Sequence, residues 1–392
     1  MKSGTAVRQR ALPFEKAMKT NAHLSGPEAA RAAGRFGSAF QVLEDAIAAR
    51  AFPGCAFGVL AGGEVVGEGA LGRFTYEDDA PAVTAETVYD VASLTKAVAT
   101  TAAAMLLFQR GELDLEMPLG ELLPGFVVGR PMGDSAYRVR LKHLLAHNSG
   151  LPGYVEFFKT AGTPMALFRQ CLELGLEAEP GARADYSDPG FILLGKALEV
   201  RTGERMDAWT QREVFQPLGM TATGFCPAMA DRRVIPPTEE DTTFRHRRIQ
   251  GEVQDENAWV LKGVAGHAGL FSNVRDLLRF AGAVLGAGGG NGPAQKPHLF
   301  ERRVVERFAQ KQGPAGSSQA LGWDTPSEVS SSGKHFSAHT IGHLGYSGCS
   351  VWIDLDSSIG VVLLTNRTWP DRKSQLIREV RPAFHDAVRK AL

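Results

Sequence analysis

The apolar residues of this chain follow helical spacing in some segments and form short buried runs in others. Residues 36–50 place apolar side chains on one face of a helix, which a Pro-Gly pair ends. Residues 56–61 form a short apolar run, and two glycines then lead into a partner segment over 64–71, which indicates a β-hairpin. Residues 93–110 again have a helical pattern, closed by a glycine. The first part of the chain therefore predicts a helix, a hairpin and a second helix.

The middle of the chain differs because helical segments alternate with loops rich in Pro and Gly, and strand signals are few. The candidate helices cover 141–147, 164–175, 190–202, 206–216, 274–286 and 299–310. A glycine-rich stretch over 286–297 predicts a surface loop. The strand pattern then returns and ends in an amphipathic helix. The last segments are predicted as strands over 337–344, 350–354 and 360–365 and a helix over 373–392.

Strands at both ends of the chain bracket the helical middle, which predicts the fold class. The simplest architecture is one antiparallel sheet built from both ends, with helices packed on it and an all-helical insert beside it. We therefore expect an α/β sheet domain made of residues 36–125 and 318–392, and a helical domain over 126–317. Residues 1–35, which lack clear periodicity, are expected to form a loose arm or a peripheral helix.

Composition and charge exclude several function classes. The chain has 392 residues, 44% of them hydrophobic, and its 43 basic and 43 acidic residues balance, which argues against nucleic acid as the main partner. The longest apolar run, residues 97–108, suits a buried helix and predicts no membrane span. The N-terminal residues lack the apolar stretch of a secretory signal, so a cytoplasmic location is expected. Four widely separated cysteines, with no C-x-x-C pair, predict isolated thiols and no thiolate metal site. No cofactor is expected.

The first candidate for chemistry is Ser93-Leu94-Thr95-Lys96, at the start of an Ala-rich helix. Residues three apart share one helix face, so Ser93 and Lys96 lie one above the other. A serine hydroxyl needs a partner to become a nucleophile, and a helix N-terminus offers N–H groups to a developing oxyanion. On its own the pattern also fits a helix cap with a solvated lysine. The same spacing at Ser331 and Lys334 falls in a Ser/Gly loop without a rigid face.

Two further motifs carry polar side chains on constrained backbone. Tyr186-Ser187-Asp188 lies between two Pro-Gly pairs, where a tyrosine can relay a proton, although Tyr76-Glu77-Asp78 has the same pattern in a polar turn. His343-Leu344-Gly345 ends a predicted strand, which can place a backbone N–H beside the nucleophile. His267-Ala268-Gly269 is its rival, and we expect no sheet edge there because a helix follows.

Taken together, these motifs resemble the serine β-lactamase and penicillin-binding protein superfamily. The closest resemblance is to the branch of class C β-lactamases, D-alanyl-D-alanine carboxypeptidases and family-eight esterases. The matching segments are 90–96 (DVASLTK), 141–152 (LKHLLAHNSGLP), 180–195 (PGARADYSDPGFILLG), 264–272 (VAGHAGLFS) and 342–354 (GHLGYSGCSVWID). The resemblance implies a β-lactamase-like, or DD-peptidase, fold of an α/β sheet domain plus an all-α insert.

The resemblance also implies roles for individual residues. Ser93 is expected to be the acylated nucleophile, Lys96 its base or hydrogen-bond partner, and Tyr186 the proton relay. The backbone N–H groups of Ser93 and Tyr346 are expected to form the oxyanion hole. Substrate contacts are expected from the side chains or backbone of Asp188, His343, Leu344 and Gly345.

Two departures from the family pattern shape the functional expectation. Asp188 stands where the family commonly has Asn, and His343-Leu344-Gly345 replaces Lys-Thr-Gly, which removes groups that would hold a substrate carboxylate. We therefore expect a serine hydrolase that forms an acyl-enzyme on a small ester, amide or peptide substrate. The alternatives are a true class C-like β-lactamase and a non-catalytic penicillin-recognising sensor. The sequence makes no prediction of the oligomeric state.

Overall fold

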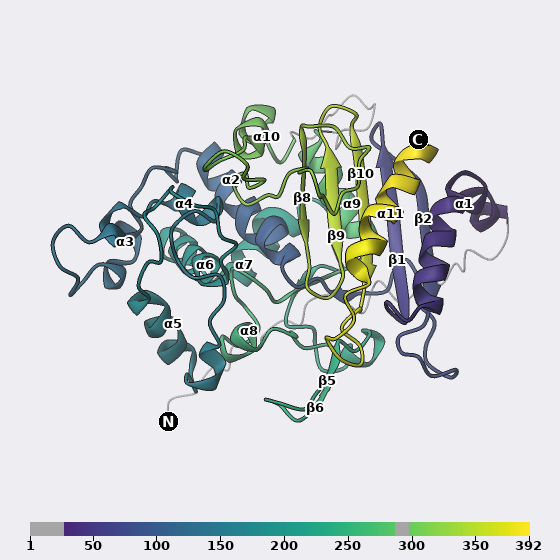
Figure 1. Cartoon of the computed structure of the whole chain (residues 1–392), viewed down its shortest axis with the longest axis horizontal. Coiled ribbons are helices and arrows are strands. Elements are labelled where there is room, and N and C mark those ends of the chain that lie inside the picture. Colours follow the sequence, from purple (N-terminus) through teal and green to yellow (C-terminus); the bar gives the residue numbers. More distant parts are fainter. Residues whose placement is uncertain (1–26, 287–297) are drawn as a thin grey trace, which may run out of the picture.

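The two ends of the chain meet in one five-stranded sheet. The computed structural model describes residues 27–286 and 298–392. All neighbouring strands of the sheet run antiparallel, in the order β2-β1-β10-β9-β8 (Figure 1). Its strands span Gly54–Ala61 (β1), Glu64–Gly72 (β2), Thr340–Leu344 (β8), Ser350–Asp354 (β9) and Ile359–Thr365 (β10). The pairing of β1 with β10 joins the N-terminal hairpin to the C-terminal strands, which confirms the predicted sheet.

Helices cover both faces of this sheet, so its inner strands β1, β10 and β9 are buried along almost their whole length, whereas the edge strand β2 is partly exposed. The helices that pack on it are α1 (Pro27–Ala48) and α11 (Ile377–Ala391) on one face and α9 (Val274–Val284) on the other (Figure 1). Phe57 of β1 meets the rings of Phe40 and Phe384 edge-on, with centroids 5.0 and 5.4 Å apart. The next residue, Gly58, faces α9, where a Cβ would lie 2.5 Å from Val274. The sheet therefore packs closely against α9.

The remaining helices lie between β2 and β8. They are α2 (Ala102–Gln109), α3 (Leu119–Leu122), α4 (Leu141–Leu145), α5 (Pro164–Glu173), α6 (Asp188–Thr202), α7 (Met206–Thr210), α8 (Glu256–Val260) and α10 (Arg302–Ala309). All of them except the short α3 and α8 fall in segments predicted to be helical. One apolar cluster reaches from Ala56 in the sheet to Leu193 in α6. The division into two domains at residues 126 and 317 stays a prediction. No helix in the described part of the chain is long and apolar enough to cross a membrane.

Some expected boundaries are wrong. The helix expected over 93–110 includes a π-helical segment, Lys96–Thr101, ahead of α2. The strand expected from residue 337 begins at Thr340, because the residues before it form a turn. Residues 27–35 of the expected arm belong to α1, whereas residues 1–26 and 287–297 of the expected arm and loop lie outside the described residues.

Short strands in the middle region were not predicted because two or three residues are too few to show a period. They are β3 (Tyr89–Asp90), β4 (Gly224–Phe225), β5 (Glu239–Asp241), β6 (Arg247–Ile249) and β7 (Leu270–Ser272). Strands β3, β7 and β4 form one small sheet, and β5 and β6 form a hairpin. The small sheet matters for function because β3 leads directly into Ser93.

Candidate active site

Ser93 follows a strained turn at the end of β3. Ala92 has a φ of 47°, in the left-handed region that non-glycine residues rarely adopt. Asp90 stabilises this conformation by accepting a hydrogen bond from the Ala92 N–H at 2.8 Å. The Thr95 hydroxyl donates to the Ala92 carbonyl at 2.6 Å. Backbone strain held in this way is typical of functional sites, and here it immediately precedes the proposed nucleophile.

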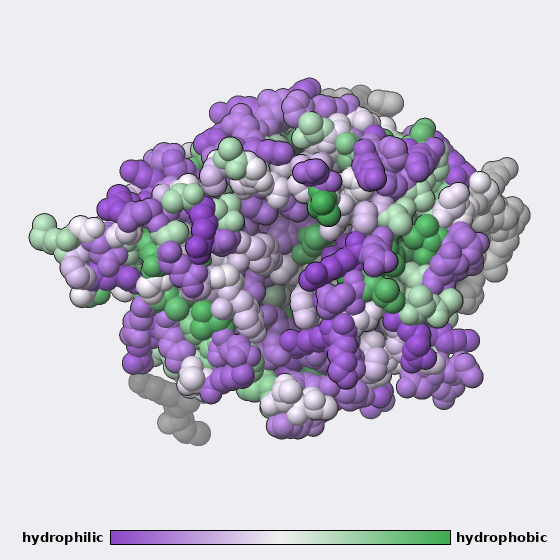
Figure 2. Space-filling model, viewed as in Figure 1, coloured by the Kyte–Doolittle hydropathy of each residue, from purple (hydrophilic) through white to green (hydrophobic). Residues whose placement is uncertain are grey.

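A cavity of about 1070 Å³ opens in front of Ser93. Figure 2 shows this face of the molecule hollowed near its centre, with mostly hydrophilic residues around the opening. The residues of the three sequence motifs that line it are Ser93, Tyr186, Asp188, His343, Leu344, Gly345 and Tyr346. The fold therefore brings these sequence-predicted residues together, although they come from three distant segments of the chain.

Lys96 is fully buried behind Ser93 and has three hydrogen-bond acceptors. Its Nζ donates to Ser93 Oγ at 3.0 Å, to Asp188 Oδ1 at 2.7 Å and to the His267 carbonyl at 3.0 Å. Burial by itself lowers the pKa of Lys96, but the Asp188 carboxylate and the Tyr186 hydroxyl outweigh it, so that the pKa is raised. An ammonium has three N–H bonds, and this geometry uses all of them.

Tyr186 stands beside both Ser93 and Lys96. The Lys96 ammonium lies 4.8 Å from the centroid of the Tyr186 ring. Although 43% of the residue is exposed, removal of its hydroxyl from water raises the pKa of Tyr186. The charge of Lys96 and hydrogen bonding with Lys96 and Ser93 act in the opposite direction without cancelling that effect. The hydroxyl therefore stays protonated at neutral pH.

The end of β8 approaches the nucleophile turn closely because Gly345 has no side chain. A Cβ at this position would lie 2.5 Å from the Val91 carbonyl oxygen. His343 is buried, which lowers its pKa to about 3, and its Nδ1 is 2.9 Å from the Leu344 carbonyl oxygen. This imidazole is therefore neutral at pH 7 and forms part of the cavity wall.

Two residues that line the cavity are candidates for the oxyanion hole through their backbone N–H groups. Within residues 27–286 and 298–392, the backbone N–H groups of Ser93 and Tyr346 donate to no protein acceptor. Both residues line the cavity. Unpaired N–H groups that face a cavity are the donors expected of an oxyanion hole.

The competing motifs do not reach this cavity through their side chains. Lys334 lies in a loop against α11, where its backbone N–H donates to Asp386 at 2.6 Å. Tyr76 packs beneath the guanidinium of Arg50, 4.0 Å from its ring centroid. Neither Tyr76 nor Ser331 lines the cavity. Tertiary structure therefore separates these motifs from the site.

The match to known proteins agrees with this arrangement. The family profile described as Beta-lactamase matches residues 39–382. The chain belongs to the β-lactamase family. Members of this family are serine hydrolases, so the protein is an enzyme of that type. In the part of the chain that the structure describes, no group of three or more His, Cys, Asp or Glu side chains could hold a metal ion.

Individual relatives cover most of the chain. An "N-acetylmuramyl-L-alanine amidase" of Bacillus subtilis is 32% identical over 361 residues, which is 83% of this chain and 80% of the relative. A Salmonella typhi protein named "Putative D-alanyl-D-alanine carboxypeptidase" is 29% identical, covering 72% of this chain and 70% of that one. A penicillin-binding protein homologue from Caulobacter crescentus has the same fold, with a TM-score of 0.72, 17% identity, and coverage of 91% and 98% of the two chains.

His147 also belongs to the site, in a role that no local sequence pattern indicates. Its ring stacks on Tyr186 with centroids 4.5 Å apart, and its Nδ1 accepts a hydrogen bond from the Ser187 N–H at 2.9 Å. Burial and the charge of Lys96 hold the pKa of His147 well below its usual range. A neutral imidazole can accept this hydrogen bond, so His147 positions the tyrosine loop. The segment 141–152 had been singled out in the sequence, but only as part of the resemblance.

The rival motif at His267 also belongs to the site, in a different role from His343. The expectation that no strand lies there is wrong, because β7 begins at Leu270 and pairs with β3 and β4 before α9 starts. The His267 carbonyl accepts from Lys96, and the Nε2 of the same residue lies 2.8 Å from Asp255 Oδ1. Burial favours a higher pKa for Asp255, but His267 and the N–H of Ala258 lower it below its usual range. An ionised carboxylate thus lines the cavity close to the Lys96–Asp188 pair. No sequence pattern had pointed to Asp255.

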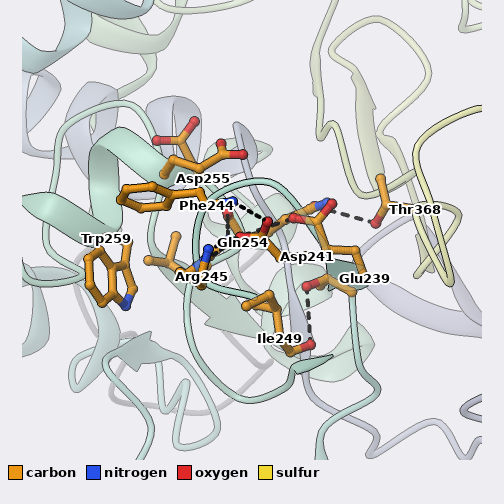
Figure 3. A network of polar contacts seen from close by, with 12 residues as sticks. Glu239, Asp241, Phe244, Arg245, Ile249, Gln254, Asp255, Trp259 and Thr368 are labelled. Carbon is orange, nitrogen blue, oxygen red and sulfur yellow. Dashed lines mark hydrogen bonds and ion pairs between the residues drawn. The ribbon is translucent and has the colours of Figure 1, made fainter. Parts of the chain in front are cut away.

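A hydrogen-bonded network connects the cavity wall to the nucleophile turn. Figure 3 shows its part around Asp241, Arg245 and Gln254. Arg245 pairs with Asp241 at 3.0 Å and donates to the Gln254 carbonyl at 2.6 Å. The Gln254 N–H in turn donates to Asp90 at 2.7 Å, and Asp90 supports Ala92. Burial opposes ionisation of Asp241, but three backbone N–H donors and Arg245 hold its pKa well below the usual range. The β5–β6 hairpin is therefore linked to the turn that presents Ser93.

Proposed function

We propose that the protein hydrolyses a small amide or ester through an acyl-enzyme on Ser93. The observation that carries this proposal is the contact of Ser93 Oγ with Lys96 Nζ at 3.0 Å, beside the Tyr186 hydroxyl. Ser93 Oγ attacks the substrate carbonyl carbon. Its proton passes to Tyr186, which releases its own proton to the leaving nitrogen or oxygen. Water then attacks the acyl-enzyme by the same route in reverse.

Lys96 acts in this proposal as a cationic hydrogen-bond donor and not as the base. The Asp188 carboxylate at 2.7 Å favours the ammonium form, and all three of its N–H bonds are used. A concerted transfer through a neutral Tyr186 needs no free phenolate, in keeping with the raised pKa of this hydroxyl. The N–H groups of Ser93 and Tyr346 would stabilise the oxyanion.

We propose a peptide amide of the bacterial cell wall as the substrate class, with small esters as accessible substitutes. Both named relatives carry names that refer to wall peptides. The cavity of about 1070 Å³ is larger than a dipeptide needs and carries charges of both signs, from Asp255 and Glu256 to Arg372. A polar peptide fits such walls better than a lipid ester does.

The predicted cytoplasmic location is supported by the four free cysteines.

Mass spectrometry combined with a substrate panel tests this proposal. A fluorophosphonate should add one adduct to wild type, mapped to Ser93, and none there to Ser93→Ala. The panel contains N-acetylmuramyl-L-alanine, a D-alanyl-D-alanine peptide, a short p-nitrophenyl ester and a cephalosporin. Ser331→Ala is the matched control and should behave as wild type. Unchanged hydrolysis by Ser93→Ala would overturn the mechanism.

The same experiment separates the two alternatives. A non-catalytic sensor would form a stable penicillin adduct and turn over nothing in the panel. A true β-lactamase would prefer the cephalosporin to the ester and the peptides. Hydrolysis of the ester alone would retain the acyl-enzyme and overturn the wall-peptide assignment.

A further inference from the structure

A buried arginine of α11 binds the backbone of the turn that follows β8. Arg381 Nη2 donates to the carbonyl oxygens of Gly345 at 2.6 Å and Cys349 at 2.8 Å, and its Nε donates to that of Gly348 at 3.2 Å. These three hydrogen bonds all go to main-chain carbonyls of one turn, and Arg381 also lines the cavity. This turn carries Tyr346, whose N–H is the second proposed oxyanion donor.

Burying the charged side chain of Arg381 lowers the stability of the folded protein. It is only 7% exposed, and none of the ion pairs in the described part of the chain includes it. Burial without a carboxylate lowers the pKa of Arg381 to about 10. An unpaired buried cation opposes folding, whereas neutral side chains can bind carbonyl groups at lower cost. The charge therefore calls for an explanation beyond hydrogen bonding.

We propose that Arg381 is a positioning residue that strengthens the oxyanion hole by polarising the Gly345–Tyr346 peptide group. The Gly345 carbonyl and the Tyr346 N–H belong to the same peptide unit. A cation bound to its oxygen draws electron density away from the nitrogen, which makes the N–H a stronger donor. The benefit is largest when negative charge develops on the substrate oxygen, so it favours the transition state over the bound substrate.

Arg367 provides a matched control within the same turn. It is also buried, at 5% exposed, and its Nε donates to the Tyr346 carbonyl at 2.7 Å. That carbonyl belongs to the next peptide unit, whose N–H is that of Ser347. Both arginines brace the turn, but only Arg381 binds the peptide group that carries the proposed oxyanion donor.

The inference rests on the proposed function, and a boronic acid separates the two. Phenylboronic acid forms an anionic tetrahedral adduct on a nucleophilic serine, so its affinity reports the oxyanion hole without turnover. For Arg381→Gln we expect the boronate affinity to fall roughly 10- to 100-fold, and kcat for a short p-nitrophenyl ester to fall by a similar factor. This loss is smaller than the loss expected when an oxyanion donor is removed completely. KM should stay within about threefold, because ground-state binding is spared. Arg367→Gln should change boronate affinity less than about threefold.

Each outcome decides between the roles. Absence of a boronate adduct on Ser93 in wild type overturns the proposed function and the inference with it. A normal adduct in wild type, with unchanged affinity in folded Arg381→Gln, overturns only the role of Arg381. Equal losses in Arg381→Gln and Arg367→Gln also overturn it, since they indicate bracing alone. If Arg381→Gln does not fold, the test uses Arg381→Lys, which keeps the positive charge. Boronate affinity within about threefold of wild type then supports the inference, and a loss of about tenfold or more contradicts it.

Discussion

Asp188 and Lys96 form an ion pair of 2.7 Å directly behind the proposed nucleophile. The Lys96 side chain has no exposed surface and the Asp188 side chain is 16% exposed, so water screens the pair only weakly. The carboxylate keeps Lys96 protonated and adds negative charge near the place where an anionic substrate would bind. This relationship sets the proton arrangement of the site and suggests how substrates are selected.

Replacing the two departures from the family pattern should move the enzyme toward β-lactams. Asp188→Asn together with Leu344→Thr removes a negative charge and adds a hydroxyl near the acyl site. We expect wild type to prefer a short p-nitrophenyl ester to a cephalosporin, and the double variant to raise penicillin acylation relative to ester hydrolysis. The measurement is kcat/KM for the ester, the cephalosporin and a penicillin in both proteins. A wild-type preference for the cephalosporin, or an unchanged ratio, would contradict this interpretation.

Lys96 and Tyr186 should act as one unit. Because both adjoin Ser93 and each other, removing either interrupts the same proton path. We expect Lys96→Met and Tyr186→Phe each to lose roughly 10²- to 10⁴-fold in kcat, and the double variant to lose little more than the worse single one. Steady-state kinetics of the three variants provide the check. Fully additive losses would indicate separate roles.

Gly345 should tolerate no side chain. Gly345→Ala brings a Cβ to within 2.5 Å of the Val91 carbonyl oxygen, so the end of β8 must move away from the nucleophile turn. A displacement of about 1 Å costs on the order of 100-fold in rate, and we expect a loss of that order in kcat/KM. Gly175→Ala, where an added Cβ meets nothing within 4 Å, is the control. Full activity of Gly345→Ala would show that the approach of β8 is not required.

Buried neutral histidines should make the protein sensitive to acid. Burial lowers the pKa of His343 and of His385 to about 3, whereas the unfolded chain titrates near 6.5. Below about pH 6.5 the unfolded chain takes up protons that the folded one does not, so the free energy of unfolding falls. The loss approaches about 1.4 kcal/mol per pH unit for each histidine until its folded pKa is reached.

His385→Gln isolates one of these contributions without touching the cavity. His385 is fully buried, contacts Ser350 at 3.1 Å, and is not among the residues that line the active-site cavity. Urea denaturation at pH 7, 6 and 5 should show a shallower decline for the variant than for wild type, while ester hydrolysis at pH 7 is unchanged. Parallel declines in the two proteins would show that His385 does not titrate as its burial implies.

Local sequence determined the strands of the main sheet, the longer helices and part of the site. Alternating patterns and apolar runs located every strand of the main sheet. This works because a side chain on a strand is apolar where its face of the sheet is covered and polar where that face is exposed to water. The spacing of Ser93 and Lys96 placed both on one helical face, which needs only the geometry of a single turn. Glycine at 345 was expected to let substrate approach the backbone, whereas the structure shows that it also lets the chain pass close to the Val91 carbonyl.

Only the tertiary structure decided how these groups act. Lys96 meets Asp188 and the His267 carbonyl across 92 and 171 residues of chain, and no local pattern encodes such contacts. His147 supports the loop of Tyr186 across 40 residues of chain, and Arg381 binds the Gly345 carbonyl across 36. A pKa or a hydrogen-bond partner depends on which charges the fold brings within a few ångströms and on how much water it removes. The sequence determined which groups were present, and packing decided their protonation and their partners.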